Sequence, residues 1–251
     1  PGAVTTALAS CGSIDACVAL LRLARQHLGA GLTGFEVMER FALALVSRHF
    51  PQLQQPLPEA PWTVLLELAT PSEDTARAQL EALLETALES GLVSDAALAA
   101  SLAQAKSMWH LRESIPLAQA EEGLNIKNDI ALPVSAIPEF VRSTDAALRV
   151  ALPGVRLVNF GHLGDGNLHY NVQAPEGEPA AEFLQAHERA VNTLVYDAVQ
   201  RWGGSISAEH GIGALKRDEL AARKSPVALG LMRTLKAALD PAGLMNPGRV
   251  V

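Results

Sequence analysis

The stretch 159–172, NFGHLGDGNLHYNV, constrains the fold more than any other part of this chain. At its centre, Asp165-Gly166 is typical of a two-residue β-hairpin turn, because both central residues of that turn require a positive φ. Such a turn places His162 opposite His169. Directly opposed residues share one face of a hairpin, with Cβ atoms about 5 Å apart. The stretch therefore predicts a β-hairpin whose two imidazoles can bind one metal ion.

A second segment with unusual chemistry is 203–213, GGSISAEHGIG, in which a carboxylate stands next to a histidine between glycines. We expect Glu209 to complete a His/His/Glu site with an open coordination position, the arrangement found where a metal acts on a substrate. His210 would then stay unligated as a base near neutral pH. The simpler alternative is a structural, hydrogen-bonded role for each histidine, and no local pattern fixes Glu209 relative to the hairpin.

The composition is that of an ordinary globular protein and excludes several classes of function. Of 251 residues, 49% are hydrophobic and 19% charged, so the chain can bury a sizeable core. The net charge of −7, with no basic stripe interleaved with aromatic residues, argues against nucleic-acid binding. No apolar run reaches the ~20 residues of a transmembrane helix, and no signal peptide is visible. Cys11 and Cys17 match no metal-site spacing and favour a reducing compartment.

Two further residues, Arg112 and Lys127, are candidates for binding an anionic substrate. Arg112 ends a predicted helix, and guanidinium geometry suits a carboxylate; the alternative is a surface arginine paired with Glu113. Lys127 begins a predicted strand and would by default be solvated. Asn171 follows His169 by two residues and so lies on the same face of the hairpin. The sequence has no GxGxxG fingerprint, P-loop or GxSxG elbow. The residues alone therefore predict a metal site beside a base and anion-binding groups.

Hydrophobic periodicity and capping residues predict alternating helices and strands. The predicted helices cover 13–28, 39–50, 72–90, 95–114, 135–150, 182–202, 212–223 and 226–239. The predicted strands cover 32–38, 62–69, 92–93 and 128–132, and the hairpin covers 155–173. This order favours an α+β domain with one mostly antiparallel sheet and helices on one face. A mainly helical part follows at 203–251.

Four motifs, in order along the chain, resemble those of one known family. They are LRESI at 111–115, GHLGDGNLH at 161–169, AEHGIG at 208–213 and NPGRV at 246–250. With these motifs and LTGFEVM at 32–38, the chain resembles the C-terminal substrate domain of FAD-linked 2-hydroxyacid dehydrogenases. These are flavoenzymes of the vanillyl-alcohol-oxidase type, and they include D-2-hydroxyglutarate and D-lactate dehydrogenases and the FAD subunit of glycolate oxidase. The resemblance covers nearly the whole chain, so residues 1–251 are expected to form that domain.

The resemblance implies a fold and a second domain. It implies a ferredoxin-like α+β cap whose sheet covers the reactive face of the flavin. In this family a preceding domain binds most of the FAD, and the segment before Ser13 is too short to hold such a domain. The chain is therefore expected to be the substrate and metal half of a larger enzyme, without turnover on its own.

The resemblance also implies a role for each candidate residue. His162, His169 and Glu209 are similar to the zinc ligands of the metal-dependent members. His210 is similar to the base that takes the hydroxyl proton while hydride passes from C2 to flavin N5. Arg112 is similar to the residue that binds the substrate carboxylate, and Asn171 to a polar contact beside it. Lys127 is similar to the residue that binds the distal carboxylate in 2-hydroxyglutarate enzymes. Asn246 is similar to a residue near the flavin. One departure is Pro116, where some 2-hydroxyglutarate enzymes have a threonine hydroxyl.

The sequence thus predicts an FAD-dependent D-2-hydroxyacid dehydrogenase, with D-2-hydroxyglutarate as the favoured substrate and D-lactate or glycolate as alternatives. Its cofactors would be FAD and Zn²⁺ or a similar divalent metal. Electrons would pass to a quinone or an electron-transfer flavoprotein, not to NAD. A homodimer is a further option, and the expected location is cytoplasmic or peripheral to the inner membrane. Two other classes could use the same three ligands: a stand-alone zinc-dependent hydrolase and a non-catalytic metal-binding module.

Overall fold

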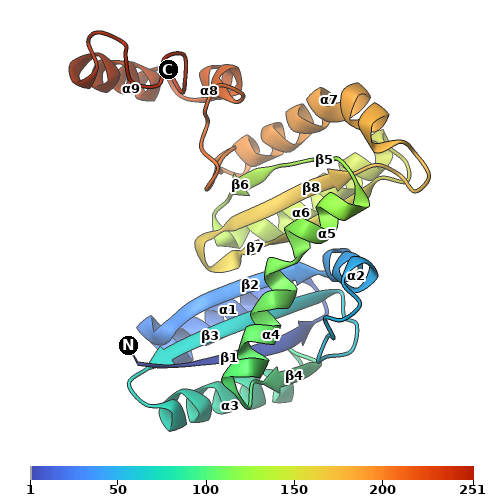
Figure 1. The fold of residues 1–251 in the computed structure, drawn as a ribbon. Coiled ribbons are helices and arrows are strands. Elements are labelled where there is room, and N and C mark those ends of the chain that lie inside the picture. Colours follow the sequence, from blue (N-terminus) through green and yellow to red (C-terminus); the bar gives the residue numbers. More distant parts are fainter. Residues whose placement is uncertain (1) are drawn as a thin grey trace.

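An eight-stranded sheet runs through the part of the chain that the computed structural model describes, residues 2–251 (Figure 1). All of its strand pairs are antiparallel. The strand order is β4-β1-β3-β2-β7-β8-β5, and β6 also pairs with β8. The strands are β1 (Ala3–Cys11), β2 (Leu32–Glu39), β3 (Trp62–Thr70), β4 (Asp95–Leu98), β5 (Asn125–Ile126), β6 (Asp129–Ala131), β7 (Arg156–His162) and β8 (Asn167–Gln173).

The α-helices connect these strands, and several of them begin at a capping serine. At the start of α1, Ser13 Oγ accepts a hydrogen bond from the N–H of Ala16 at 3.1 Å, and Ser101 and Ser225 cap α4 and α9 in the same way. Such a cap satisfies one of the free N–H groups of a first helical turn. The helices are α1 (Ile14–Leu28), α2 (Arg40–His49), α3 (Glu73–Glu89), α4 (Leu102–Glu113), α5 (Ile115–Glu122), α6 (Ile137–Ala151), α7 (Ala180–Arg201), α8 (Arg217–Arg223) and α9 (Pro226–Leu239).

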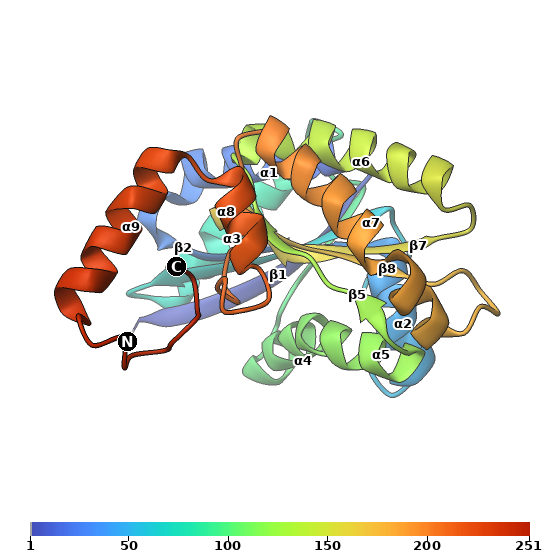
Figure 2. The ribbon, with the colours of Figure 1, turned by 90° about the horizontal axis from the view of Figure 1, so that it is seen from above.

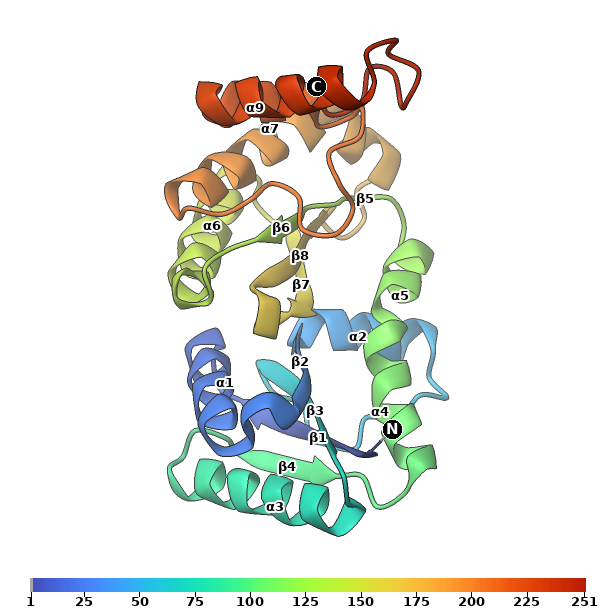
Figure 3. The same ribbon diagram turned by 90° about the vertical axis from the view of Figure 1, so that its left-hand side faces the viewer.

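Helices cover both faces of the sheet (Figure 2, Figure 3). On one face, α1, α3, α6 and α7 pack over a large core that includes Leu66, Leu168 and Tyr170. On the other face, α2, α4 and α5 pack over a smaller core that includes Leu65 and Phe160. Side chains alternate along a strand, so neighbours such as Leu65 and Leu66 enter opposite cores. The predicted α+β class with an antiparallel sheet is confirmed, and a second helical layer is present beyond the single layer that the sequence predicts.

The sheet consists of two ferredoxin-like units joined edge to edge. In the first unit, β1-α1-β2-β3-α3-β4 forms a βαββαβ motif with strand order 4-1-3-2. In the second, β6-α6-β7-β8-α7 repeats the first five elements, and a bridge between Ala131 and Ser205 stands in place of a fourth strand. The equivalent strands β2 and β7 pair and join the units. This β2–β7 seam places Glu36 opposite His162.

Two parts of the first unit differ from the predicted elements. Strand β1 has no predicted counterpart, because seven of its nine residues are buried and the sequence therefore lacks the alternation of a half-exposed strand. The predicted helix over 95–114 begins too early. The predicted strand at 92–93 is wrong, because these two residues belong to no strand. Residues 95–98 form β4, paired with β1, and α4 begins only after its cap at Ser101. Pairing with β1 overrides the helix propensity of this alanine-rich segment.

Residues 203–251 extend beyond α7 and contain α8 and α9 (Figure 1). The only buried residue of α9 is Leu229. Four other large apolar side chains of this helix are exposed: Val227, Leu231, Leu235 and Leu239. The end of the chain returns to the segment before α8, where the N–H of Val250 donates to the oxygen of Gly213 at 2.9 Å. Within residues 2–251, no helix has both the length and the apolar character needed to cross a membrane.

Candidate metal and substrate site

The hairpin of β7 and β8 brings His162 and His169 to one face of the sheet by a route that differs from the predicted one. The observed register pairs His169 with Phe160, not with His162. The predicted two-residue turn is wrong because a short helical turn, Leu163–Asp165, precedes Gly166. His162 and Phe160 are two residues apart on β7, so both histidines still share a face. Their ring centroids are 6.2 Å apart.

Gly166 is the residue that the end of this turn requires. Its φ of 76° lies in the left-handed region. A Cβ at this position would lie 2.1 Å from the backbone oxygen of Leu132, directly after β6. A larger residue would push the segment after β6 away, so Gly166 determines how close β6 and the hairpin approach each other.

The carboxylate of Glu209 completes a cluster with the two imidazoles. Its Oε1 lies 3.4 Å from Nε2 of His162, and its Oε2 lies 3.7 Å from Nε2 of His169. The ligand atoms of these three residues all lie within 4.8 Å of one another. Ligands about 2.0–2.2 Å from a tetrahedral zinc ion are roughly 3.3–3.6 Å apart. The three side chains therefore fit one divalent cation.

A second group of potential ligands, Asp129, His169 and His210, also lies within 4.8 Å. The carboxylate of Asp129 is less suited to a metal, because its Oδ2 accepts hydrogen bonds from the N–H groups of Glu209 and His210, both at 2.8 Å. Burial opposes ionisation of Asp129, but these two hydrogen bonds outweigh it and lower the pKa of the carboxyl. Among the described residues, no donor occupies the carboxylate of Glu209. The His162/His169/Glu209 cluster is thus the better candidate metal centre.

A buried carboxylate, Glu36, links this cluster to α4. Its Oε1 lies 2.6 Å from Nδ1 of His162, and its Oε2 accepts a hydrogen bond from Nε of Arg112 at 2.9 Å. Burial raises the pKa of Glu36, but the hydrogen bond from His162 and the charge of Arg112 outweigh burial, so its pKa is lowered. The ionised carboxylate can only accept a hydrogen bond, so Nδ1 of His162 carries a proton, and Nε2 is the ring nitrogen that faces Glu209.

No role is predicted for Glu36, although its place in the sequence carries one signal. A single acidic residue stands in the apolar run Phe35-Glu36-Val37-Met38, in a strand with neighbours on both sides. Charged side chains are rarely buried unless they are paired. A buried carboxylate in a central strand therefore indicates a basic partner nearby, but the pattern does not identify that partner.

Arg112 is buried, with 6% of its surface exposed. Its guanidinium carbon lies 4.8 Å from the centre of the Phe160 ring, and its Nε is bound to Glu36. The alternative of a surface arginine paired with Glu113 is therefore wrong. No oxygen of residues 2–251 accepts a hydrogen bond from the two terminal nitrogens of Arg112. These nitrogens are available for the carboxylate of a ligand.

The pKa values of the two imidazoles of the cluster are shifted in opposite directions. Burial and the positive charge of Arg112 lower the pKa of His169 to about 4, so His169 is neutral at physiological pH. The hydrogen bond to Glu36 raises the pKa of His162. A neutral His169 is ready to bind a metal, because a metal takes the unprotonated ring nitrogen.

The other predicted substrate-binding residues lie further along the same face. Asn171 is buried; its Nδ2 donates to Oε1 of Gln119 at 3.0 Å, and its Oδ1 accepts from the N–H of Asn128 at 3.1 Å. The register of β5 and β6 on β8 places Lys127 opposite Asn171, and Lys127 is exposed. One N–H of Asn171 and the ammonium group of Lys127 have no partner among the described residues.

Asn246 and His210 are both exposed. Asn246 has a φ of 49° and lies in the segment after α9, which is held by contacts with Arg217 and Gly213. No hydrogen bond of the described chain links it to the His/His/Glu cluster. The side chain of His210 is 59% exposed, and its ring centroid lies 5.9 Å from that of His169. His210 is therefore accessible beside the cluster, whereas Asn246 has no contact with it.

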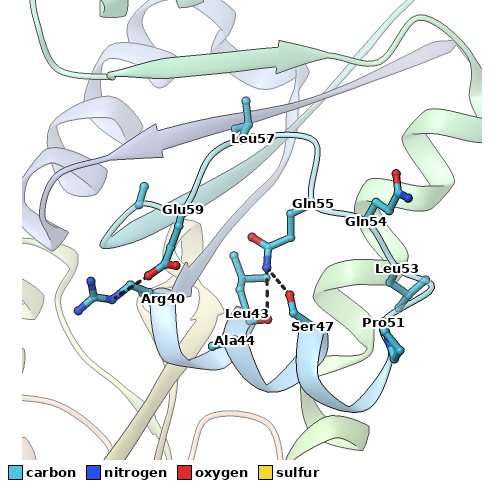
Figure 4. Close-up of a pocket in the computed structure, with 11 residues that line it drawn as sticks. Arg40, Leu43, Ala44, Ser47, Pro51, Leu53, Gln54, Gln55, Leu57 and Glu59 are labelled. Carbon is cyan, nitrogen blue, oxygen red and sulfur yellow. Dashed lines mark hydrogen bonds and ion pairs between the residues drawn. The ribbon is translucent and has the colours of Figure 1, made fainter.

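A small cavity borders the cluster, and a larger one lies away from it. A cavity of about 220 Å³ is lined by Glu36, His162, Thr33 and Gly34, among other residues, and so opens directly beside the cluster. A larger cavity, of about 640 Å³, lies between α2 and the loop 51–61 (Figure 4). None of the residues that line the larger cavity belongs to the site. The smaller cavity is therefore the one that bears on the candidate site.

The fold and the site together define a ferredoxin-like domain that presents a candidate metal-binding cluster and a buried arginine on one face. The chain belongs to the family described as FAD linked oxidases, C-terminal domain, whose family model matches residues 1–250. The resemblance noted in the sequence is thereby confirmed.

Individual relatives agree with this family. The chain is 36% identical over 250 residues to a mitochondrial D-2-hydroxyglutarate dehydrogenase of Arabidopsis thaliana, covering 99% of this chain and 43% of that protein. It is 42% identical over 220 residues to a D-2-hydroxyglutarate dehydrogenase of Xanthomonas citri pv. viticola, covering 87% of this chain and 46% of that protein. The chain thus spans less than half the length of these relatives.

A solved structure shares the fold. The structure of p-cresol methylhydroxylase with substrate bound superimposes with a TM-score of 0.70 at 12% sequence identity, covering 100% of this chain and 53% of that chain. At this identity the similarity establishes the fold alone.

Proposed function

We propose that this chain is the substrate- and metal-binding half of an FAD-dependent D-2-hydroxyacid dehydrogenase. The supporting observation is the convergence of His162, His169 and Glu209 beside the buried Arg112, in a chain of the FAD-linked oxidase family. D-2-hydroxyglutarate is the favoured substrate, because both relatives described above are D-2-hydroxyglutarate dehydrogenases. D-lactate and glycolate are the alternatives.

His162, His169 and Glu209 would hold Zn²⁺ or a similar divalent metal and leave a position open for the substrate. When bound, the metal would supply a Lewis acid that lowers the pKa of the substrate hydroxyl. The protein prepares both imidazoles for this role. Glu36 holds the proton of His162 on Nδ1, and burial with the charge of Arg112 keeps His169 neutral.

The remaining residues would orient the substrate. The terminal nitrogens of Arg112 would bind the carboxylate at C1, because Nε is already held by Glu36 and the guanidinium plane is fixed. Asn171 would donate its second N–H beside that carboxylate. Lys127, opposite Asn171 and exposed, would bind the distal carboxylate of 2-hydroxyglutarate. Each of these contacts positions the C2–H bond of the substrate.

His210 would act as the base. It would take the proton of the 2-hydroxyl as hydride leaves C2, so that a 2-oxo acid forms. FAD, held mainly by another domain, would accept the hydride, and Asn246 would lie near the flavin. The exposure of the His210 ring would let the proton pass to water afterwards.

The proposal extends to partners that the chain alone does not identify. Electrons would leave the flavin for a quinone or an electron-transfer flavoprotein, and a homodimer is an option. We propose a cytoplasmic location or peripheral attachment to the inner membrane. The name of the Arabidopsis relative places that enzyme in mitochondria, so fractionation of the source cells tests the location.

The experiment is a test of both metal and flavin dependence. With its FAD-binding domain supplied, the protein should reduce a dye with D-2-hydroxyglutarate, lose this activity after treatment with a chelator and regain it with Zn²⁺. Without the flavin domain, no turnover is expected. Activity that survives complete removal of metal would overturn the metal assignment. Hydrolysis of an ester or amide by this chain with Zn²⁺ and no flavin would identify a hydrolase instead.

A further inference from the structure

The segment that carries Glu209 and His210 is not held by regular structure or by packing of their side chains. Residues 206–213 belong to no helix or strand. The side chain of Glu209 is 51% exposed and that of His210 is 59% exposed. Other contacts must therefore set the position of this segment relative to the hairpin that carries His162 and His169.

Asp129 makes those contacts. Its Oδ2 accepts hydrogen bonds from the N–H groups of both Glu209 and His210, each at 2.8 Å. Its backbone oxygen accepts a third, from the N–H of Ala208 at 3.3 Å. Three consecutive N–H groups thus bind one residue. Successive N–H groups can form a concave site for an anion, and here a carboxylate of the same chain occupies it.

Asp129 is itself held in place. It is 2% exposed and lies on β6, where it pairs with His169 of β8. Its Oδ1 accepts a hydrogen bond from Nδ2 of Asn167 at 2.8 Å, and the same amide group donates to the oxygen of Ile130 at 3.0 Å. The carboxylate therefore fixes the Glu209–His210 segment to the strands that carry the histidine cluster.

The same carboxylate faces one edge of two imidazoles. Oδ1 of Asp129 lies 3.8 Å from Nδ1 of His169, and Oδ2 lies 3.8 Å from Nδ1 of His210. A negative charge on this side favours the tautomer with a proton on Nδ1 and leaves a lone pair on Nε2. In His169 that nitrogen faces Glu209. In His210 it is left to accept a proton.

We infer that Asp129 is a positioning residue that places Glu209 against the two metal-binding histidines and holds His210 beside them without ligation. The roles of Glu209 as a metal ligand and of His210 as a base rest on the proposed function. The placement of the Glu209–His210 segment by Asp129 does not.

The test compares Asp129→Asn and Asp129→Ala with the control Asp145→Asn in the full chain. Asp129→Asn preserves the size of the side chain and removes its charge. Asp145 is a second buried aspartate, on α6, whose Oδ1 accepts a hydrogen bond from Tyr170 at 2.5 Å. Tyr170 belongs to the core on the opposite face of the sheet. Hydrogen exchange at the N–H groups of Glu209 and His210 is followed by NMR in metal-free protein, and Zn²⁺ affinity by competition titration.

We expect both Asp129 variants to exchange these two amide hydrogens faster and to lose roughly 10- to 100-fold in Zn²⁺ affinity. Asp145→Asn should change the melting temperature but neither the two exchange rates nor the Zn²⁺ affinity. Unchanged exchange at both amides in folded Asp129→Asn would overturn the positioning role, even where the unmodified protein binds Zn²⁺. An unmodified protein that binds no Zn²⁺ would overturn the proposed metal site, while faster exchange in the variant would still support the geometric role of Asp129.

Discussion

Glu36 and His162 face each other across the β2–β7 seam, and Oε1 of Glu36 lies 2.6 Å from Nδ1 of His162. The two residues are 126 positions apart in the chain. Their contact exists only because the two ferredoxin-like units join at this line. It connects a candidate metal ligand of one unit to a carboxylate of the other, and through that carboxylate to Arg112.

Glu36→Gln should lower Zn²⁺ affinity roughly 10- to 100-fold, because a neutral amide no longer holds the proton of His162 on Nδ1. It should also destabilise the protein by about 3–5 kcal/mol, since Arg112 loses its buried partner. Competition titration and thermal unfolding separate these effects. In the control Glu122→Gln, a carboxylate bound by basic residues of α2 and β7 is lost, so stability should fall while Zn²⁺ affinity remains. Unchanged affinity in Glu36→Gln would contradict the role of Glu36.

Arg112→Lys should lower kcat/KM for the 2-hydroxyacid at least roughly 30-fold in the complete enzyme. Truncating a buried charged pair costs about 2–5 kcal/mol, and an ammonium group cannot bind Glu36 and a substrate carboxylate with the fork geometry of a guanidinium. The neighbouring Glu113 is exposed, and Glu113→Ala is the matched control, with near-normal kinetics expected. Near-normal kcat/KM in Arg112→Lys would exclude the carboxylate clamp.

Alanine substitutions should separate the ligands from the base. His162→Ala, His169→Ala and Glu209→Ala should each reduce bound zinc, because each removes one atom of a three-residue site. His210→Ala should retain zinc and abolish oxidation in the complete enzyme. Metal content measured by elemental analysis, alongside dye reduction, checks this division. Equal loss of metal in all four variants would show that His210 is a ligand as well.

Glu39, at the end of β2, should make the protein less stable as pH rises. Burial, followed by the negative charge of Asp145, raises the pKa of Glu39 from 4.5 to about 7, and its Oε2 has no hydrogen-bond partner within residues 2–251. Above pH 4.5 the unfolded chain releases a proton that the folded protein keeps. The free energy of unfolding should therefore fall as pH rises through the range from 4.5 to about 7 and stay reduced above it.

Glu39→Gln should remove this part of the pH dependence. Denaturant unfolding at pH 5 and pH 8 measures the difference in the free energy of unfolding for each variant. The side chain of Glu59 is 75% exposed, so Glu59→Gln should preserve the difference. If Glu39→Gln shows the same fall in stability between the two pH values as the unmodified protein, another group is responsible.

His162 and His169 share a face of the sheet because the observed register differs from the predicted one by two residues. A shift of one residue would have placed them on opposite faces. The exact register is not visible in the sequence, since it depends on the helical turn Leu163–Asp165, which the Asp-Gly signal does not reveal. The α+β class is visible in the alternation of helical and extended segments. Strand β1 is not visible in the sequence, because a strand buried on both faces lacks the alternation of apolar and polar residues on which the prediction of a strand depends.

Contacts between distant segments explain what the sequence does not show. Glu209 reaches the histidines because its N–H binds Asp129, 80 residues earlier, and no local pattern reports such a contact. Arg112 is buried because it pairs with Glu36, a carboxylate on β2 that is 76 residues away in the chain. In both cases a single charged residue on a strand, Glu36 or Asp129, organises the site, and its importance depends on which segments become neighbours.

The seam between β2 and β7 has a consequence for how the protein comes apart. All three candidate ligands, His162, His169 and Glu209, belong to the second unit, and the first unit contributes only Glu36, the carboxylate that holds His162. Opening of the sheet along the seam should therefore leave the three ligands together but remove the contact that orients one of them. A bound ion would then be held more weakly once the seam opens, and an affinity that stays unchanged on opening would mean that the first unit has no part in holding the ion.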